Sequence, residues 1–341
     1  MIAAADLDHC RAAIREGSYS FHAASRLLPA RVRDPALALY AFCRVADDEV
    51  DFGDNKPAAV LALRDRLDLC YAGRPRNAPA DRAMAALIET YDMPRELPEA
   101  LLEGLAWDGM ERRYATLSDV RAYSARVAAA VGAMMCVLMR VREARTLARA
   151  CDLGVAMQLT NIARDVGEDA RAGRFYLPTD WMEEVGLDLD AFLANPQPGP
   201  EIQGLVKRLL AEANRLYYRA EPGIARLPLS ARPGIFAARH CYDAIGNRLK
   251  RSGHDSVTHR AYTTKAQKLG LLGWSLIRAG TVSLFPQSAV IYAKPLDEVA
   301  FLVEAAAHPD PAKKGWGENV LSVLSELEAK DRSRRSLAGA A

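Results

Sequence analysis

The chain has 341 residues, of which half are hydrophobic, 26% are charged and 7% are aromatic. This composition supplies a large apolar core and excludes a disordered chain. The formal net charge is only +2, without a long run of one sign, so we expect no nucleic-acid partner.

Proline, glycine and capping residues divide the sequence into a series of helices. Asp34-Pro35 has the pattern of an N-cap followed by a first helical residue, and it predicts a helix that ends before Gly53. Ser118 is the expected cap of a later helix, and Gly173 is the expected stop of a long one. Helices are also predicted over about residues 57–71, 98–114, 118–141, 145–173, 200–219, 233–252, 264–281 and 315–334.

Strand signals are nearly absent, because the chain lacks alternating runs of β-branched residues. It also lacks internal repeats and low-complexity tracts. We therefore predict an all-α fold with one continuous helical domain over residues 1–285. Residues 286–341 are expected to form a small C-terminal helical appendage.

Six scattered cysteines show neither a CxxC pair nor a zinc-binding spacing, and we interpret them as reduced thiols of a cytoplasmic protein. The N-terminus lacks the apolar core of a signal peptide. The longest apolar stretch, residues 269–285, is interrupted by Arg278 and is shorter than the about 20 residues of a spanning helix. We expect this stretch to be buried in the core; the alternative is a peripheral contact with a membrane surface.

Acidic residues cluster at the end of the helix that is predicted before Gly53. Asp47 and Asp51 are four residues apart and therefore lie on one helical face, with Arg44 one turn earlier. Their charges repel each other and lie at the negative end of the helix dipole. A bound cation would relieve both effects. An acidic, solvated helix end is the alternative, whereas the residue spacing of a calcium-binding EF-hand is missing.

A second polar stripe marks the long helix before Gly173. Asn161, Asp165 and Asp169 follow one another at intervals of four residues, and Gln158 extends the stripe backwards. The other faces of this helix are apolar, which is typical of a helix that lines a wet cavity. A structural polar network inside a helical bundle is the alternative.

Oxygen ligands without histidine or cysteine suit Mg²⁺ or Mn²⁺ rather than zinc. Magnesium that is held by few carboxylates usually shares its ligands with substrate phosphates. Two facing stripes would therefore hold metal ions around a diphosphate, with additional positive charge from Arg44, Arg164 and Arg174.

Metal ions and arginines that neutralise a diphosphate favour its departure from an allylic substrate, which leaves a carbocation. Such a cation survives only in a dry pocket with small and apolar walls. The Ala-, Val- and Met-rich helix 118–141 fits such a wall, although an ordinary core helix has the same composition.

These motifs resemble the signatures of the squalene/phytoene synthase family. The second signature matches Leu153-Gly154, Gln158-Leu-Thr-Asn161-Ile-Ala-Arg164-Asp165-Val-Gly-Glu-Asp169 and Arg174-Phe-Tyr176-Leu-Pro178. The first matches Tyr40-Ala-Phe-Cys-Arg44 with Asp47, Asp48 and Asp51. Shorter matching blocks are Ser18-Tyr-Ser20-Phe21, Glu103-Gly104 with Asp108, and Tyr123 with Val127-Ala128 and Val131-Gly132. The likeness covers about residues 10–280 and implies an all-α class I isoprenoid synthase with a central cavity.

The resemblance also implies roles for individual residues. The expected metal ligands are Asp47, Asp51, Asn161, Asp165 and Asp169. The residues expected at the phosphate end are Arg44, Gln158, Arg164, Arg174 and Tyr176, with Arg260 and Lys268 reaching the diphosphate from the C-terminal side. Ser20 and the cavity-lining Tyr40, Tyr123 and Tyr242 are expected to contact the substrate. Direct catalytic roles are expected for Asp47, Asp51, Asp165, Asp169, Arg44 and Tyr123. Structural roles for the tyrosines, and surface roles for Arg260 and Lys268, are the alternatives.

The chain departs from the family at Ala129-Ala130, where Gly-Thr is usual, and at Ser124-Ala125, where Cys-Tyr is common. Both pairs lie on the expected cavity wall. The length and shape of the pocket therefore do not follow from the resemblance.

The reaction that the resemblance implies has two steps, needs Mg²⁺ or Mn²⁺ and is expected to need no NADPH. Two geranylgeranyl diphosphates first form a cyclopropylcarbinyl diphosphate, which then ionises, rearranges and loses a proton to give phytoene. One alternative is a squalene or dehydrosqualene synthase that uses farnesyl diphosphate, and another is a non-catalytic helical assembly subunit. A head-to-tail elongase would carry a second DDxxD motif where this chain has Asn161, Asp165 and Asp169. A terpene cyclase would lack the long second signature.

Overall fold

The computed structural model describes residues 2–52, 55–284, 288–310 and 315–338, without the side chains of residues 47, 50–52 and 334–338. The described residues form helices and no strand, which confirms the predicted all-α fold. The α-helices are α1 Ala4–Gly17, α2 Tyr19–Ser25, α3 Ala30–Phe52, α4 Lys56–Tyr71, α5 Pro79–Tyr91, α6 Glu96–Gly109, α7 Leu117–Ser124, α8 Ala130–Leu138, α9 Ala144–Arg171, α10 Thr179–Glu184, α11 Leu189–Ala194, α12 Pro200–Ile224, α13 Arg232–Arg251, α14 Lys265–Thr281, α15 Ala300–Ala307 and α16 Glu318–Ala338. The shorter turns are the π-helical η1 Ala125–Ala129 and the 3₁₀ turns η2 Val282–Leu284, η3 Ala289–Tyr292 and η4 Asp297–Val299.

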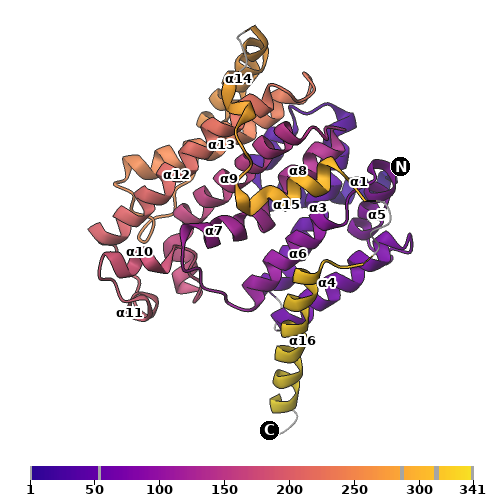
Figure 1. Cartoon of the computed structure of the whole chain (residues 1–341). Coiled ribbons are helices and arrows are strands. Elements are labelled where there is room, and N and C mark those ends of the chain that lie inside the picture. Colours follow the sequence, from indigo (N-terminus) through magenta and orange to yellow (C-terminus); the bar gives the residue numbers. More distant parts are fainter. Residues whose placement is uncertain (1, 53–54, 285–287, 311–314, 339–341) are drawn as a thin grey trace.

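The long helix α9 organises the molecule (Figure 1). It packs against α8, α12, α13, α15 and η1. Its apolar residues Leu159, Ile162 and Val166 are buried in the main hydrophobic core. Because α9 is packed against several helices, the polar side chains along it are fixed relative to the rest of the fold.

The start of α3 differs from the prediction. α3 begins at Ala30 rather than at Pro35, which lies inside the helix. The carbonyl oxygen of Pro29 accepts the backbone N–H of Val32 at 2.9 Å, so the helix is already established upstream of Pro35. The described part of α3 extends to Phe52, and the predicted stop at Gly53 lies outside the described residues.

The predicted cap of the next apolar helix was also wrong. Thr116 and Asp119 form a reciprocal capping box before α7, so Ser118 is a residue inside the helix and not its cap. α6 ends at Gly109 rather than at Tyr114. All six cysteines are free, and all except Cys43 are buried.

The helix Leu117–Leu138, composed of α7, η1 and α8, forms a wall against α9. Among the described residues, it is the one helix that is long and apolar enough to cross a membrane, but 56% of its most apolar window is buried. Gly154 of α9 lies so close to it that an added Cβ would be 2.6 Å from the Cα of Ala129. This close approach and the burial favour a core wall.

The apolar stretch 269–285 is not buried as expected. Most of it forms α14 and η2, in which only Ser275 and Ala279 are buried. Leu269, Trp274 and Ile277 are exposed to solvent. The core interpretation was therefore wrong for residues 269–284; Phe285 lies outside the described residues.

The described C-terminal residues pack on the core. α15 contacts α9, α8 and α6, and α16 contacts α4 and α6 at the end of the molecule away from α14 (Figure 1). The indole N–H of Trp316 donates to Asp68 at 3.0 Å, and the guanidinium of Arg95 lies 4.8 Å from the Trp316 ring centroid. The boundary that the sequence predicts at residue 285 lies outside the described residues and stays a prediction.

Candidate active site

The predicted polar stripe runs along one face of α9. Asn161, Asp165 and Asp169 occur at intervals of four residues within the helix, which places them on the same side. The Asp165 and Asp169 side chains are each only 16% exposed. Two carboxylates in this partly dry environment need cationic neighbours.

Asp165 has two arginine partners. Arg164 donates from Nε to Oδ1 of Asp165 at 2.7 Å. Arg260 donates from Nε to Oδ1 at 2.8 Å and from Nη2 to Oδ2 at 3.2 Å. Burial raises the pKa of Asp165, but the hydrogen bonds from the two arginines outweigh it and bring the pKa below its ordinary value. Asp165 is therefore ionised at neutral pH.

Arg260 reaches α9 because the segment before it lies directly on the helix. The backbone N–H of Gly167 donates to the carbonyl of Ser256 at 3.0 Å. Arg171 donates to the carbonyl of Val257 at 2.5 Å. An added Cβ at Gly167 would be 2.4 Å from the Val257 oxygen, so only glycine allows this contact. The sequence contains Gly167 within the second signature, but the spacing alone gave it no role.

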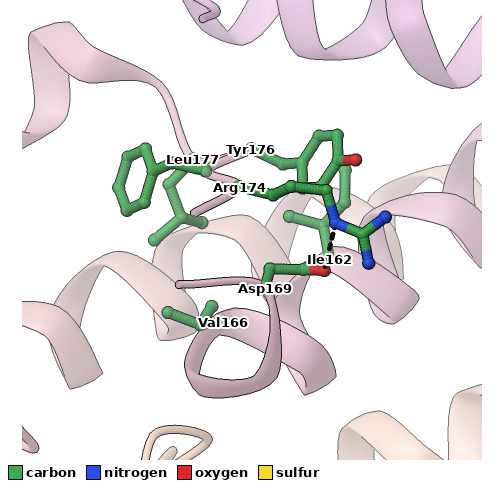
Figure 2. A pocket seen from close by; sticks show the side chains of 7 residues that line it. Ile162, Val166, Asp169, Arg174, Tyr176 and Leu177 are labelled. Atoms are coloured by element: carbon green, nitrogen blue, oxygen red, sulfur yellow. Dashed lines mark ion pairs between the residues drawn. The ribbon is translucent and has the colours of Figure 1, made fainter. Parts of the chain in front are cut away.

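Asp169 differs electrostatically from Asp165. Its nearest cation is Arg174, whose Nε lies 3.8 Å from Oδ1, and Figure 2 shows this arginine reaching back over Asp169 from the segment after α9. Burial and the negative charges of Asp165, Glu168 and Asp108 raise the pKa of Asp169 to about 7. A cation at this position would stabilise the ionised carboxylate.

A small cavity lies beside Asp169, lined by Ile162, Val166, Asp169, Arg174, Phe175, Tyr176 and Leu177 (Figure 2). Its lining combines one carboxylate and one guanidinium with apolar and aromatic groups. The cavity is much smaller than a prenyl chain, so the large central cavity of the sequence analysis stays a prediction.

Asp108 joins two of the tyrosines. It lies near the end of α6 and accepts the hydroxyl of Tyr123 at 2.9 Å and that of Tyr176 at 2.8 Å. The rings of Tyr123 and Tyr176 stack with centroids 5.1 Å apart, and Tyr114 lies 5.2 Å from Tyr123. Burial and the charge of Asp108 raise the pKa of both phenols well above 10, so they stay neutral donors.

Asp108 belongs to one of the short motif blocks of the sequence, but the sequence alone assigns it no function. The residue lies in a helix that precedes both tyrosines in the chain, and sequence spacing does not reveal such a contact. The available signal was an acidic residue within an otherwise apolar helix end, Leu-Ala-Trp-Asp-Gly.

The other two tyrosines that are predicted to line the cavity, Tyr40 and Tyr242, both contact the ring of Phe21 in α2. The ring of Phe21 lies 5.5 Å from that of Tyr242 and 6.4 Å from that of Tyr40. Burial raises the pKa of Tyr242, which is almost completely buried in α13. Ser20 is half-buried in α2 next to Phe21.

Lys268 does not lie on the α9 carboxylates in this structure. Lys268 lies in the first turn of α14, and its ammonium is 5.7 Å from the ring centroid of Tyr19. Arg260 lies on Asp165 of the stripe, whereas the contacts of Arg260 and Lys268 with a diphosphate stay predictions.

The first aspartate motif is described only in part. Asp47 and Asp51 lie on α3, but their side chains fall outside the described residues, and their role as metal ligands stays a prediction. Arg44 forms an ion pair with Asp48 one turn later. Gln158 accepts a hydrogen bond from the amide of Asn161 at 3.4 Å, so it continues the stripe as predicted.

The α9 stripe fits a hard cation. Among the residues with described side chains, no cluster of three or more His, Cys, Asp or Glu is arranged as a metal site. The Oδ1 of Asn161 is nevertheless buried without a hydrogen-bond partner, and a buried oxygen of this kind needs a donor or a cation. Together with Asp169 it offers ligands that Asp47 and Asp51 would have to complete.

The arrangement combines a region for a charged group and a region for an apolar one. Arg164, Arg174 and Arg260 gather around the carboxylates of α9, where a diphosphate and cations would balance one another. The neutral ring of Tyr176 lines the cavity beside Asp169 and stacks on the ring of Tyr123, so aromatic and apolar groups adjoin the carboxylate. This pairing suits the ionisation of an allylic diphosphate.

Comparison with known proteins gives the same picture. The profile of the family described as squalene/phytoene synthase matches residues 14–267. The chain is 63% identical to a phytoene synthase of Cereibacter sphaeroides, over 97% of this chain and 96% of that protein. It is 62% identical to a phytoene synthase of Rhodobacter capsulatus, over 97% of this chain and 98% of that protein.

Solved structures with similar folds include a dehydrosqualene synthase in complex with a ligand, with a TM-score of 0.75 and 29% identity over 81% of this chain and 97% of that chain. A squalene synthase from Alicyclobacillus acidocaldarius has a TM-score of 0.67 and 25% identity, over 73% of this chain and 95% of that chain. The helical isoprenoid synthase fold that the sequence predicts is thus confirmed. This chain belongs to the squalene/phytoene synthase family.

Proposed function

We propose that the protein joins two molecules of geranylgeranyl diphosphate head to head and forms phytoene with release of diphosphate, a step of carotenoid biosynthesis. The observation that carries this proposal is the identity of more than 60% with two phytoene synthases over nearly the whole chain. The intact α9 stripe agrees with it, since a non-catalytic relative would have no need to keep these carboxylates and arginines.

We propose Mg²⁺ or Mn²⁺ as the cofactor. The ligands would be Asn161, Asp165 and Asp169 on α9 together with Asp47 and Asp51 on α3. A divalent ion bound here would neutralise the diphosphate and improve it as a leaving group. The buried Asn161 oxygen and the raised pKa of Asp169 support this assignment.

Three arginines would bind the diphosphate. Arg164 and Arg260 already flank Asp165, and Arg174 flanks Asp169, so the phosphate oxygens would enter between these cations. Arg260 is 54% exposed and lies on a segment between helices, so it can exchange Asp165 for a phosphate more readily than the buried Arg164. Arg44 and Gln158 would complete the phosphate end.

The tyrosines would hold the apolar part of the intermediate. Asp108 fixes Tyr123 and Tyr176 through their hydroxyls, and the two stacked rings would stabilise a nearby positive charge. The phenols keep their protons because burial and Asp108 raise their pKa. Tyr40 and Tyr242 would line the cavity on the other side, next to Phe21.

A second candidate function is the coupling of two farnesyl diphosphates to squalene or dehydrosqualene. The observation that favours it is the fold shared with a dehydrosqualene synthase. Reductive squalene formation would need a nicotinamide cofactor, which we do not expect for this chain. A peripheral contact with a membrane and a cytoplasmic location complete the proposal.

The test is an end-point assay with Mg²⁺ and each prenyl diphosphate, with and without NADPH, followed by mass identification of the hydrocarbon. We expect phytoene from geranylgeranyl diphosphate without NADPH. A hydrocarbon that forms from farnesyl diphosphate but not from geranylgeranyl diphosphate would support the second candidate function instead. No hydrocarbon from either substrate, with protein that is folded and binds Mg²⁺, would indicate a non-catalytic subunit.

A further inference from the structure

Helix α14 exposes several large apolar side chains to solvent. Four of them are more than half exposed: Leu269 at 72%, Ile277 at 58%, Trp274 at 53% and Leu276 at 51%. In an ordinary amphipathic helix such residues face the core, and small or polar residues face the solvent. On α14 these four residues face the solvent, whereas Leu271 and Leu272 of the same helix are half-buried.

Specific contacts fix that orientation. The buried face of α14 carries Ser275 and Ala279 and packs on α13. The Oγ of Ser275 lies 2.8 Å from Nδ1 of the buried His240, and Arg278 binds Glu221 at 3.1 Å. At about 100° per residue, the exposed apolar residues lie on the half of the helix opposite Ser275. Turning them inward would break both polar contacts.

The exposed apolar surface continues beyond α14. Tyr262 before the helix is 75% exposed, and Leu284 in the following turn is 79% exposed. Arg232 donates to Ser283 at 2.5 Å and to the carbonyl of Leu227 at 2.8 Å, which ties this turn to the loop that carries the 67% exposed Leu229. We call Leu229, Tyr262, Leu269, Trp274, Leu276, Ile277 and Leu284 the α14 surface.

The charge of α14 identifies its partner. The helix Lys265–Thr281 contains Lys265, Lys268 and Arg278 and no acidic residue. An exposed apolar face that includes tryptophan, on a helix whose charged residues are all cations, matches an interface of acyl chains and anionic headgroups. A protein partner would instead need a complementary face that is both apolar and acidic.

The α14 surface begins beside the candidate active site. Arg260, which binds Asp165, lies only a few residues before the start of α14, and Tyr262 lies between the two. Lys268, in the first turns of α14, packs on the ring of Tyr19 at the start of α2. Most of α14 lies beyond residue 267, where the family profile ends.

We propose that the α14 surface docks on an anionic lipid bilayer and places the entrance of the active site at the membrane. The choice of site rests in part on the proposed function, because a prenyl diphosphate and a long hydrocarbon both dissolve in lipid. Docking would let the substrate enter, and the product leave, without crossing water. The binding itself needs no substrate.

The test is co-sedimentation of the full chain with vesicles, without substrate. We expect binding to vesicles of phosphatidylglycerol and phosphatidylcholine, and weaker binding to phosphatidylcholine alone. In Trp274→Glu/Ile277→Glu, the vesicle-bound to free ratio should fall at least about tenfold, because two inserted apolar groups become anions. The matched control is Leu321→Glu, at a 46% exposed residue of α16, which should bind as the wild type does.

Two further readouts separate the possible failures. Circular dichroism and turnover of detergent-dispersed substrate should be unchanged in the double variant, since both altered side chains are exposed and away from the arginines. Wild type that makes product in detergent but does not bind anionic vesicles would overturn the inference and leave the proposed function intact. A wild-type dimer that the double variant converts to a monomer would assign the α14 surface to a second copy and also overturn it.

Discussion

Asp165 and Asp169 are one helical turn apart, yet their surroundings separate them chemically. Two arginines hold the pKa of Asp165 below its ordinary value, whereas burial and neighbouring carboxylates raise that of Asp169 to about 7. Asp165 is thus ionised at neutral pH without a bound metal ion, whereas Asp169 needs a nearby cation to be fully ionised. The stripe itself was predictable from the spacing, but this difference depends on Arg260 and Asp108, which come from distant parts of the chain.

The two hydrogen bonds that Asp108 accepts from tyrosine hydroxyls give a prediction for this residue. Asp108→Ala removes the acceptor of the Tyr123 and Tyr176 hydroxyls, so both rings lose their fixed orientation. We expect kcat to fall about ten- to a hundredfold, which corresponds to the loss of one or two hydrogen bonds to a charged group. Steady-state kinetics with the prenyl diphosphate measure the effect. The control is Asp65→Ala at an exposed residue of α4; equal kinetics of the two variants would contradict the role of Asp108.

Gly167 gives a second prediction. A Cβ at this position would overlap the Val257 backbone, so Gly167→Ala should push the segment that carries Arg260 away from Asp165. We expect a loss of about 1–3 kcal/mol in the free energy of unfolding and a higher KM for the diphosphate substrate. Denaturant unfolding and kinetics measure the two effects.

The matched control is Gly204→Ala in α12, where no atom lies within 4 Å of the new Cβ. Alanine should stabilise that helix by up to about 1 kcal/mol. If both variants keep wild-type KM and stability, the close contact between Gly167 and Val257 is not present in solution.

At the scale of elements, helix termini were predictable where a residue acts locally. The stop of α9 follows from Gly173, which has a positive φ of 74°. The predicted helix starts were wrong where two possible start residues lie close together. The helix α3 begins directly after Pro29 and not at Pro35, and Thr116 with Asp119 caps α7 in place of Ser118.

The orientation of α14 was beyond the sequence. Its composition fits a core helix as well as a surface helix, and only the packing partner decides which face is inward. Here His240 and Glu221, on α13 and α12, select the small polar face. The expectation of a buried apolar helix was therefore wrong for a reason that no local pattern contains.

The His240–Ser275 contact predicts a pH dependence of stability. Burial lowers the pKa of His240 to about 4, with a smaller effect of Arg239 in the same direction and opposing effects of Glu221 and Asp243. Unfolding exposes the imidazole, whose ordinary pKa is about 6.5. The unfolded state therefore binds a proton that the native state does not, so the contribution is complete above pH 6.5 and is lost as the pH falls towards 4.

The size of the effect is at most about 3 kcal/mol. His240→Asn removes the titrating group and keeps a polar atom near Ser275. Between pH 7 and 4.5 the variant should lose less stability than the wild type, as measured by urea unfolding. Parallel pH profiles of the two proteins would show that His240 is not buried in its neutral form.

At the scale of the whole molecule, the fold places the charged residues along α9 close to the exposed apolar α14 surface. α9 carries the acidic stripe through the core, and the chain returns across it at residues 254–260 before it forms α14. The all-α architecture and the second signature were predictable because helix periodicity and motif spacing are local properties. The Asp108 bridge, the close contact at Gly167 and the outward face of α14 were not, since each depends on how distant segments pack.

The central claim is that the α9 stripe drives metal-dependent loss of diphosphate from a prenyl substrate. The most direct measurement is release of inorganic diphosphate from geranylgeranyl diphosphate, titrated with Mg²⁺ after removal of metal by EDTA, in the wild type and in Asp165→Asn. We predict Mg²⁺-dependent release by the wild type and at least about a hundredfold slower release by the variant, with an unchanged circular dichroism spectrum. Release that is independent of metal, or a variant with near-wild-type activity, would contradict the account.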